Sequence, residues 1–261
     1  MTGTHHSFDT RACANITDLC ASFSTQQLQS PTRSTVPLID LVYHHRPTWE
    51  RFLKMLGAPL GCMVSFELGV PSPKARGNPS QTDAVFASDS SVWAIEAKWT
   101  EPIDRQTVAK RISKPEADGG DPRVTVGGWL SHLQPLCPKP LRVGDFGEII
   151  YQMVHRAASA AYLAQKRNLK PELVYLHFVP SPRSDSATTE HYVSELTRLH
   201  ERLARTPTLP ISVVEMPLEY TEAFDAIKDL DKRSPATSQK VKQALCAGPV
   251  FRFGEPAMIR I

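Results

Sequence analysis

The alternation of hydrophobic and polar residues predicts one helix and three strands in the first part of the chain. Apolar residues recur every three or four positions from Pro47 to Leu56, which predicts a helix that ends at Gly57. Residues 62–70 and 82–88 then alternate with period two, and residues 91–100 form a third β-prone run. Turn residues separate these runs, which predicts three strands joined as hairpins.

The second part of the chain alternates between helical and strand patterns. It predicts, in order, helices at 124–136 and 144–168, a strand at 172–179, a helix at 191–205, a strand at 210–216, and helices at 221–230 and 238–246. The order α-β-β-β-α-β, extended by α-β-α, predicts an α/β fold with a mixed central sheet flanked by helices. Residues 36–261 are expected to form one domain. Residues 1–35 are rich in Ser, Thr, Gln and Asn and are expected to form a flexible arm.

Composition narrows the class of protein only a little. The chain has 261 residues, of which 41% are hydrophobic, and a formal net charge of +3, which permits nucleic-acid binding without requiring it. No run of 18 apolar residues and no signal-peptide pattern is present, so a soluble, cytoplasmic protein is expected, without a membrane partner. The cysteines are widely spaced and lack a C-x-x-C pair, which argues against a disulfide framework or a zinc knuckle. Buried, reduced thiols are expected at Cys13, Cys20, Cys62, Cys137 and Cys246.

A charged pair in an otherwise apolar strand raises the question of function. Side chains alternate along a strand, so Glu96 and Lys98 share one face with Val92 and Ala94. A solvated outer face is one explanation for the pair. The other explanation includes Asp83, because a hairpin that turns near residues 89–90 would bring Asp83 and Glu96 together on that face.

Two facing carboxylates beside an ammonium group would suit a divalent cation. Mg²⁺ prefers oxygen ligands and keeps several waters, so Asp83, Glu96 and one backbone carbonyl would be enough. Such a cation lowers the pKa of a bound water and neutralises charge on a phosphate, while Lys98 would orient the water or stabilise the transition state. These residues predict metal-dependent hydrolysis of a phosphodiester bond.

Asp83, the run Glu96-Ala97-Lys98 and the α-β-β-β-α-β order together resemble the PD-(D/E)XK nuclease superfamily over residues 47–179. The resemblance implies a restriction-endonuclease-like core and an endonuclease that cuts DNA with Mg²⁺ or Mn²⁺ as its cofactor. It implies that Asp83, Glu96 and the carbonyl of Ala97 hold the metal, and that Lys98 positions the attacking water. Thr82 stands where the family usually has a proline, a departure that the superfamily often shows.

Further positions extend the resemblance, each with an alternative reading. Many members carry an acidic residue in the helix before the first strand, which implies a catalytic role for Glu50; the alternative is a glutamate favoured by the helix dipole. Gln152 and Arg156 resemble a Q-x-x-x-R/Y element that contributes to the site or holds DNA, and the alternative is the solvent face of a helix. Glu67 is expected to point outward, with an extra metal ligand as the alternative.

Basic residues near the predicted site suggest how a substrate would bind. Lys74 and Arg76 precede Asp83 in a loop and are expected to contact a phosphate backbone, with ordinary surface residues as the alternative. DNA is the expected partner, RNA stays open, and a homodimer would allow both strands to be cut. Two other functions compete: a catalytically silent module that binds nucleic acid or protein on the same fold, and an unrelated α/β domain that carries these residues on its surface.

Overall fold

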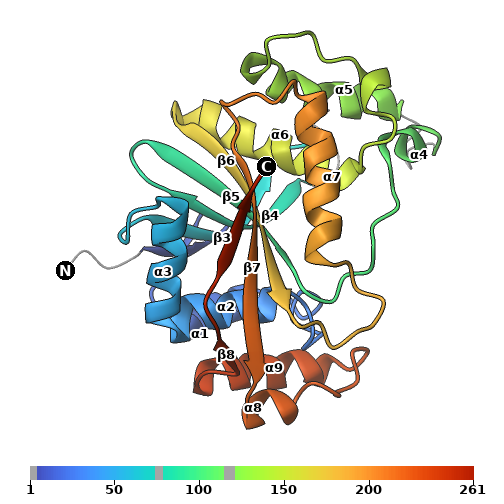
Figure 1. The fold of residues 1–261 in the computed structure, drawn as a ribbon. Helices are drawn as coiled ribbons and strands as arrows, with labels where there is room; N and C mark the ends of the chain where they lie inside the picture. The colour runs from blue at the N-terminus through green and yellow to red at the C-terminus, as the bar shows by residue number, and fades with distance from the viewer. Residues whose placement is uncertain (1–4, 74–78, 115–120) are drawn as a thin grey trace.

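The computed structural model describes residues 5–73, 79–114 and 121–261, and these residues form an α/β fold (Figure 1). Within them, nine strands form one mixed sheet with helices on both faces. The strand order is β2-β1-β3-β4-β5-β6-β7-β8, and β9 pairs with β7. The predicted α/β class, with a mixed sheet flanked by helices, is confirmed.

The predicted hairpins and crossovers form the centre of this sheet. Three strands pair antiparallel in sequence order: β3 (Met63–Val70), β4 (Ser80–Ala87) and β5 (Ser91–Lys98). Two helical crossovers then add two parallel strands, through α6 (Tyr151–Arg167) to β6 (Lys170–Val179) and through α7 (Thr189–Arg202) to β7 (Ile211–Tyr220). The carboxyl ends of β5, β6 and β7 therefore meet at one end of the sheet, where open α/β sheets commonly bind ligands.

Helices bury both faces of the sheet. One face packs against α2 (Thr35–His44), α3 (Arg46–Leu56) and α9 (Pro235–Ala247), and the other packs against α5 (Pro122–Leu133), α6 and α7. Each face has its own hydrophobic core, so a side chain on either face of a central strand lies inside the protein. The strand pattern alone could not show this, because half-exposed sheets are also common.

The faces of β5 are as predicted, but neither is solvated. Trp93 and Ile95 belong to the core beneath α2 and α3, whereas Val92 and Ala94 belong to the core beneath α6. Glu96 and Lys98 continue the second set, and they are only 2% and 6% exposed. The explanation of this pair as a solvated outer face is wrong.

The expected flexible arm is also wrong for its described part, residues 5–35. Residues 6–8 and 11–13 form the paired strands β1 (His6–Phe8) and β2 (Arg11–Cys13), and β1 joins the sheet parallel to β3. The helix α1 (Ile16–Ser22) follows, with Asn15 accepting a hydrogen bond from the backbone of Asp18 as an N-cap. The few apolar residues of this polar segment, among them Leu19, Phe23 and Leu28, are buried in the main core. The boundary expected between residues 35 and 36 therefore does not separate two structural units.

Shorter elements complete the fold at its margins. They are α4 (Val108–Ile112), η1 (Gln134–Leu136), η2 (Val143–Phe146), α8 (Glu222–Asp225), β8 (Phe251–Phe253) and β9 (Ala257–Arg260). The helix predicted from Gly144 begins at Tyr151 instead, because η2 occupies the preceding residues. Across the described ranges, every helix is too short or too polar to cross a membrane.

Candidate functional site

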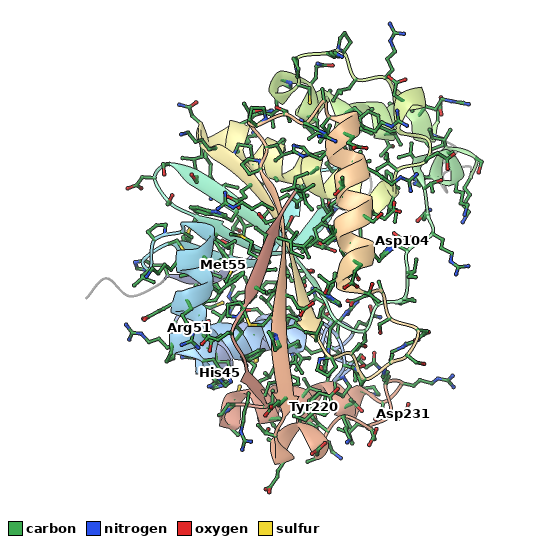
Figure 2. All side chains as sticks on the ribbon, viewed as in Figure 1. His45, Arg51, Met55, Asp104, Tyr220 and Asp231 are labelled. Carbon is green, nitrogen blue, oxygen red and sulfur yellow. The ribbon has the colours of Figure 1, made fainter. Side chains whose placement is uncertain are left out.

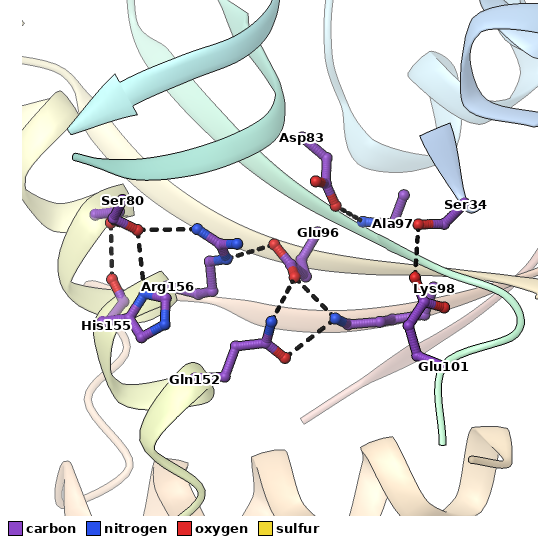
Figure 3. Close-up of polar contacts among 11 residues, drawn as sticks. Ser34, Ser80, Asp83, Glu96, Ala97, Lys98, Glu101, Gln152, His155 and Arg156 are labelled. Atoms are coloured by element: carbon purple, nitrogen blue, oxygen red, sulfur yellow. Dashed lines mark hydrogen bonds and ion pairs between the residues drawn. The ribbon is translucent and has the colours of Figure 1, made fainter. Parts of the chain in front are cut away.

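The candidate site lies where β4 and β5 separate. Their ladder runs from the pair Ala87–Val92 to the pair Ala84–Ile95, and the next step would place Asp83 opposite Glu96. Instead of continuing the ladder, the Asp83 side chain accepts a hydrogen bond of 2.8 Å from the backbone N–H of Ala97 through its Oδ2 (Figure 3).

This hydrogen bond also fixes the direction of the Ala97 carbonyl. In a strand, the N–H and C=O groups of one residue point to the same side. The carbonyl of Ala97 therefore faces the side from which Asp83 approaches. The sequence predicted that Asp83 would meet this stretch of β5, and the structure places it there.

Glu96 is the centre of a buried polar cluster (Figure 3). Its Oε1 accepts hydrogen bonds from Lys98 Nζ at 2.9 Å and from Gln152 Nε2 at 3.2 Å. Its Oε2 lies 2.5 Å from Arg156 Nε. Lys98 Nζ also donates to Gln152 Oε1 at 3.1 Å, so strand β5 and helix α6 are joined through one closed network. Gln152 and Arg156 thus face the sheet, and their alternative placement on a solvent-exposed helix face is wrong.

The surroundings of the two carboxylates, Glu96 and Asp83, shift their pKa values in opposite directions. Burial alone would raise the pKa of Glu96, but the Arg156 guanidinium and the Lys98 ammonium together lower it. Burial, and then the charge of Glu96, raises the pKa of Asp83 well above its usual range. Although burial opposes it, the carboxylate of Glu96 raises the pKa of Lys98. Neighbouring acids with such different environments are typical of active sites, although structural ion pairs can show the same pattern.

Arg156 is held on its other side by Ser80, at the start of β4. Arg156 Nη1 donates to Ser80 Oγ at 2.9 Å, and the same hydroxyl contacts His155 Nδ1 at 3.1 Å and Ser159 Oγ at 3.3 Å. The guanidinium is therefore fixed between β4 and β5. Neither Ser80 nor His155 was predicted to have this role, because only the fold brings residue 80 next to α6.

Glu67 also belongs to this region, contrary to the expected outward orientation. By the β3–β4 register it lies opposite Asp83, and its charge contributes to the raised pKa of Asp83. It is partly buried and accepts a hydrogen bond of 3.2 Å from Gln27 Nε2. Burial raises the pKa of Glu67 itself. A third acidic side chain therefore acts on the same site.

The backbone of Glu67 has the left-handed conformation, with φ at 51°. Regular strand alternation would place residues 64, 66, 68 and 70 on one face. Instead, Val64 and Phe66 belong to one hydrophobic core, and Leu68 and Val70 belong to the other. The unusual conformation of Glu67 thus reverses the faces of β3 at the level of the site.

Glu50 does not join the cluster, so its predicted catalytic role is wrong. Its carboxylate is 38% exposed and pairs with Arg46 Nε at 2.7 Å within α3. It lines a cavity with residues 88–91, the turn at the opposite end of the β4–β5 hairpin from Asp83. The cause is packing: Trp49 and Phe52 of α3 contact Phe86, near that turn. Lys74 and Arg76, predicted to bind the phosphate backbone, lie outside the described residues.

A row of polar residues on the neighbouring strands was not predicted at all. In the parallel ladders, Lys98 pairs with His177 of β6, and His177 pairs with Glu215 of β7. Thr189, in the first turn of α7, connects the last two: its hydroxyl donates to Glu215 Oε2 at 2.6 Å and lies 2.8 Å from His177 Nδ1. Because that hydroxyl proton is given to Glu215, Nδ1 of His177 must donate to the hydroxyl oxygen. The Nε2 atom is left as an acceptor.

Tyr175 lies on β6, two residues before His177 and beside the cluster around Glu96. It pairs with Glu96 in the parallel ladder and is completely buried, and its hydroxyl has no hydrogen-bond partner within the residues that the structure describes. Burial, and then the charge of Glu96, raises the pKa of Tyr175. The alternation in residues 172–179 puts Tyr175 and His177 on one face. That signal was present in the sequence, but the parallel pairing with β5 was needed to interpret it.

A cavity of about 340 Å³ gives the cluster an approach from outside. Lys98 and Gln152 form part of its wall, together with residues 101–105 after β5 and Tyr192 of α7. Asp104, in the stretch after β5, lies beside α7 (Figure 2). It is large enough for a small polar group beside the ammonium of Lys98. The site is therefore a buried charged cluster with one accessible side.

Comparison with known proteins gives a family without an assigned role. Residues 11–213 match the family described as "Domain of unknown function (DUF6946)", and the chain belongs to this family. The matched range contains the whole cluster around Glu96. No curated protein and no solved structure matches the chain.

Proposed function

We propose that the protein is a Mg²⁺-dependent nuclease of the PD-(D/E)XK type that cuts DNA. The observation that carries this proposal is the arrangement of Asp83, Glu96 and Lys98 where β4 leaves β5, with Gln152 and Arg156 supplied by α6. A buried acidic and basic cluster of this kind costs free energy unless it is well paired, and removal of one partner is strongly destabilising. A cluster that also borders a cavity is better explained by function than by stability.

The arrangement of elements supports a restriction-endonuclease-like core. α3, the meander β3-β4-β5, α6 and β6 follow one another in the order that the resemblance implies. The four strands are neighbours in the sheet in that same order, with β6 parallel to β5. The charged residues lie on β5 and on the helix that covers it.

The oxygen atoms at the site fit a divalent cation such as Mg²⁺ or Mn²⁺. Asp83, Glu96 and the carbonyl of Ala97 would hold it, and all three supply the oxygen ligands that these ions prefer. The mutual repulsion of Glu67, Asp83 and Glu96, visible in their effects on the pKa of Asp83, would be relieved by such a charge. When bound, the cation would activate water and neutralise charge on the phosphate.

The protein's own cations would act on the substrate directly. The raised pKa of Lys98 keeps its ammonium protonated, so it would serve as a donor to a water or a phosphate oxygen and not as a base. Glu96 and Gln152 hold that ammonium in place. Arg156 carries a fixed positive charge whose planar guanidinium suits a phosphate group.

A catalytically silent binding module is the second candidate, and one observation favours it. Glu96 Oε1 already accepts hydrogen bonds from Lys98 and Gln152, and Oε2 forms an ion pair with Arg156, so the charge of Glu96 is balanced without a cation. Within residues 5–73, 79–114 and 121–261, no three His, Cys, Asp or Glu side chains are grouped closely enough to hold a metal ion. A silent domain would keep the same network to fix α6 on the sheet.

Cleavage assays separate the two functions. Supercoiled plasmid and a labelled single strand would be incubated with the full chain and Mg²⁺, Mn²⁺ or EDTA. For a nuclease, we expect metal-dependent cutting that falls at least about 100-fold in both variants, because Glu96→Gln removes a charge that would hold the cation and Lys98→Met removes one that would act on the water or the phosphate. Glu219→Gln, which changes an exposed glutamate on β7, is the matched control and should cut like the wild type.

Binding measurements complete the design. If the folded wild type cuts neither substrate with either metal but still retains DNA in a filter assay, the silent module is favoured. If it neither cuts nor binds, both proposals for this site fail. Thermal unfolding with and without Mg²⁺ gives an independent check, because a cation that binds only the folded state raises Tm.

A further inference from the structure

Two thiols from opposite ends of the chain meet where α1 packs against α9. Cys20 lies on α1 and Cys246 lies near the end of α9, and Cys246 is close enough to Cys20 to raise the pKa of its thiol. Both are free thiols. α1 and α9 lie side by side in the lower part of the molecule (Figure 1). The sequence, with its odd number of scattered cysteines, gave no sign of this pair.

The two thiols differ in their surroundings. Cys20 is 2% exposed, and burial, followed by the charge of Cys246, raises the pKa of Cys20 to about 12. Cys246 is exposed, contrary to the expectation that all five cysteines are buried. An oxidant in solution would therefore reach Cys246 first, and Cys20 would react only with a group already bound to its neighbour.

A second contact holds the two helices together beside the thiols. Lys242, one helical turn before Cys246, donates from its Nζ to the backbone carbonyl of Phe23 at 2.6 Å. Phe23 is the C-cap residue of α1. This tether lies one helical turn from Cys20 on α1 and one turn from Cys246 on α9, so it holds the two helices together at the level of the thiols.

We propose that Cys20 and Cys246 form an oxidisable thiol pair that a peroxide converts to a disulfide between α1 and α9. The sulfur of Cys246 attacks the peroxide, whose O–O bond breaks, and a sulfenic acid forms with release of one water or alcohol. The sulfur of Cys20 then displaces the hydroxyl group, which leaves as water with the thiol proton. In total, two thiols give up two electrons and two protons to the peroxide.

The disulfide would join the N-terminal layer of the sheet to the last helix. Gln27, in the segment that follows α1, donates to Glu67 beside the candidate site, so oxidation would also restrain a segment that contacts the site. This inference does not depend on the proposed nuclease function. Disulfides of proteins in reducing compartments are usually transient and redox-sensing, and the free-thiol form described here is the reduced state of such a pair.

Mass spectrometry of the full chain tests the proposal. After treatment with hydrogen peroxide, remaining thiols are alkylated and the protein is digested. We expect a cross-linked peptide that contains Cys20 and Cys246, and its loss after reduction with dithiothreitol. Because a cross-link between distant residues restrains the unfolded chain, Tm should rise by roughly 5–10 °C on oxidation and return on reduction.

Variants show whether the pair itself is responsible. Cys246→Ser, at an exposed position, should fold normally and lose both the cross-linked peptide and the rise in Tm. Cys137→Ser, a change to a cysteine outside the pair, should keep both. The proposal is overturned if folded wild type keeps both thiols free after peroxide, or if Cys246 is converted to a sulfinic acid while Cys20 stays reduced.

Discussion

At the scale of single residues, the most informative position is Glu67. A left-handed backbone at a residue other than glycine costs roughly 1–2 kcal/mol. Such outliers persist where the surrounding structure enforces them, and they are concentrated at functional sites. Here the conformation reverses the faces of β3 and directs a carboxylate towards Asp83. Regular strand alternation predicts the opposite orientation, which is why the sequence pattern misled for this residue.

Glycine and alanine at position 67 should reveal that backbone cost. Glu67→Gly and Glu67→Ala both remove the carboxylate, but glycine accepts a positive φ without strain. We expect Glu67→Gly to be the more stable of the two by about 1 kcal/mol, or roughly 2–4 °C in Tm. The exposed Gln81 on β4 is the matched control: there the glycine variant should be the less stable one. Equal Tm values for the two variants at position 67 would contradict the left-handed conformation.

The pH dependence of stability should report on His155. Burial, followed by the charge of Arg156, lowers the pKa of His155 to about 3, whereas an unfolded histidine has a pKa near 6.5. Between these values the unfolded state binds a proton that the folded state does not, so stability must fall as the pH falls below 6.5. The loss is up to about 1.4 kcal/mol for each pH unit.

His155→Gln removes that titration and keeps a group that can bond to Ser80. Between pH 7 and pH 5, urea unfolding should therefore show a smaller loss of stability in this variant than in the wild type. His5→Gln, at an exposed position, should follow the wild type. Parallel curves for His155→Gln and the wild type would mean that His155 is not buried in its neutral form.

At the scale of elements, local sequence patterns predicted whether a segment is a helix or a strand better than they predicted where that segment packs in the fold. Period-two alternation correctly placed Glu96 and Lys98 on one face, because alternation is a property of the strand itself. The position of α3 along the hairpin depends on how Trp49 packs against Phe86, which no local pattern contains, and Glu50 was misplaced for that reason. The row through His177 was missed because pairing between β5 and β6 joins residues that are far apart in sequence.

Docking of α7 depends on the hydroxyl of Thr189. Replacing it with the similarly shaped valine leaves the Nδ1–H of His177 and an oxygen of Glu215 without their partner. Buried polar groups that lose a partner cost about 1–3 kcal/mol, so we expect Thr189→Val to lower the free energy of unfolding by that amount. Thr197→Val on the same helix removes only a bond to its own helix backbone and should cost much less. Chemical denaturation of both variants would compare them, and equal losses would contradict the bridging role of Thr189.

At the scale of the whole molecule, the N-terminal segment is part of the sheet and its core. Its polar composition suggested an arm, but composition averages over a segment, and burial depends on where a few apolar residues lie. β1 covers the edge of β3, and Leu19 and Leu28 are completely buried. Each fully buried side chain of this type contributes about 1.5–3 kcal/mol. Leu19 and Leu28 together therefore contribute about 3–6 kcal/mol, a large fraction of the net stability of a typical domain, which is about 5–15 kcal/mol.

Truncation tests whether the segment is required for folding. A chain of residues 36–261 would leave the edge of β3 unpaired and expose the core surface that α1 covers, so we expect it to aggregate or to lack a cooperative unfolding transition. A chain of residues 5–261 retains all of these contacts and is the control. Circular dichroism, size-exclusion chromatography and thermal unfolding of both chains would be compared. If residues 36–261 gave a monomer with the Tm of the control, β1 and α1 would be accessory to the sheet, and a cross-link from Cys20 could not stabilise the remainder of the chain.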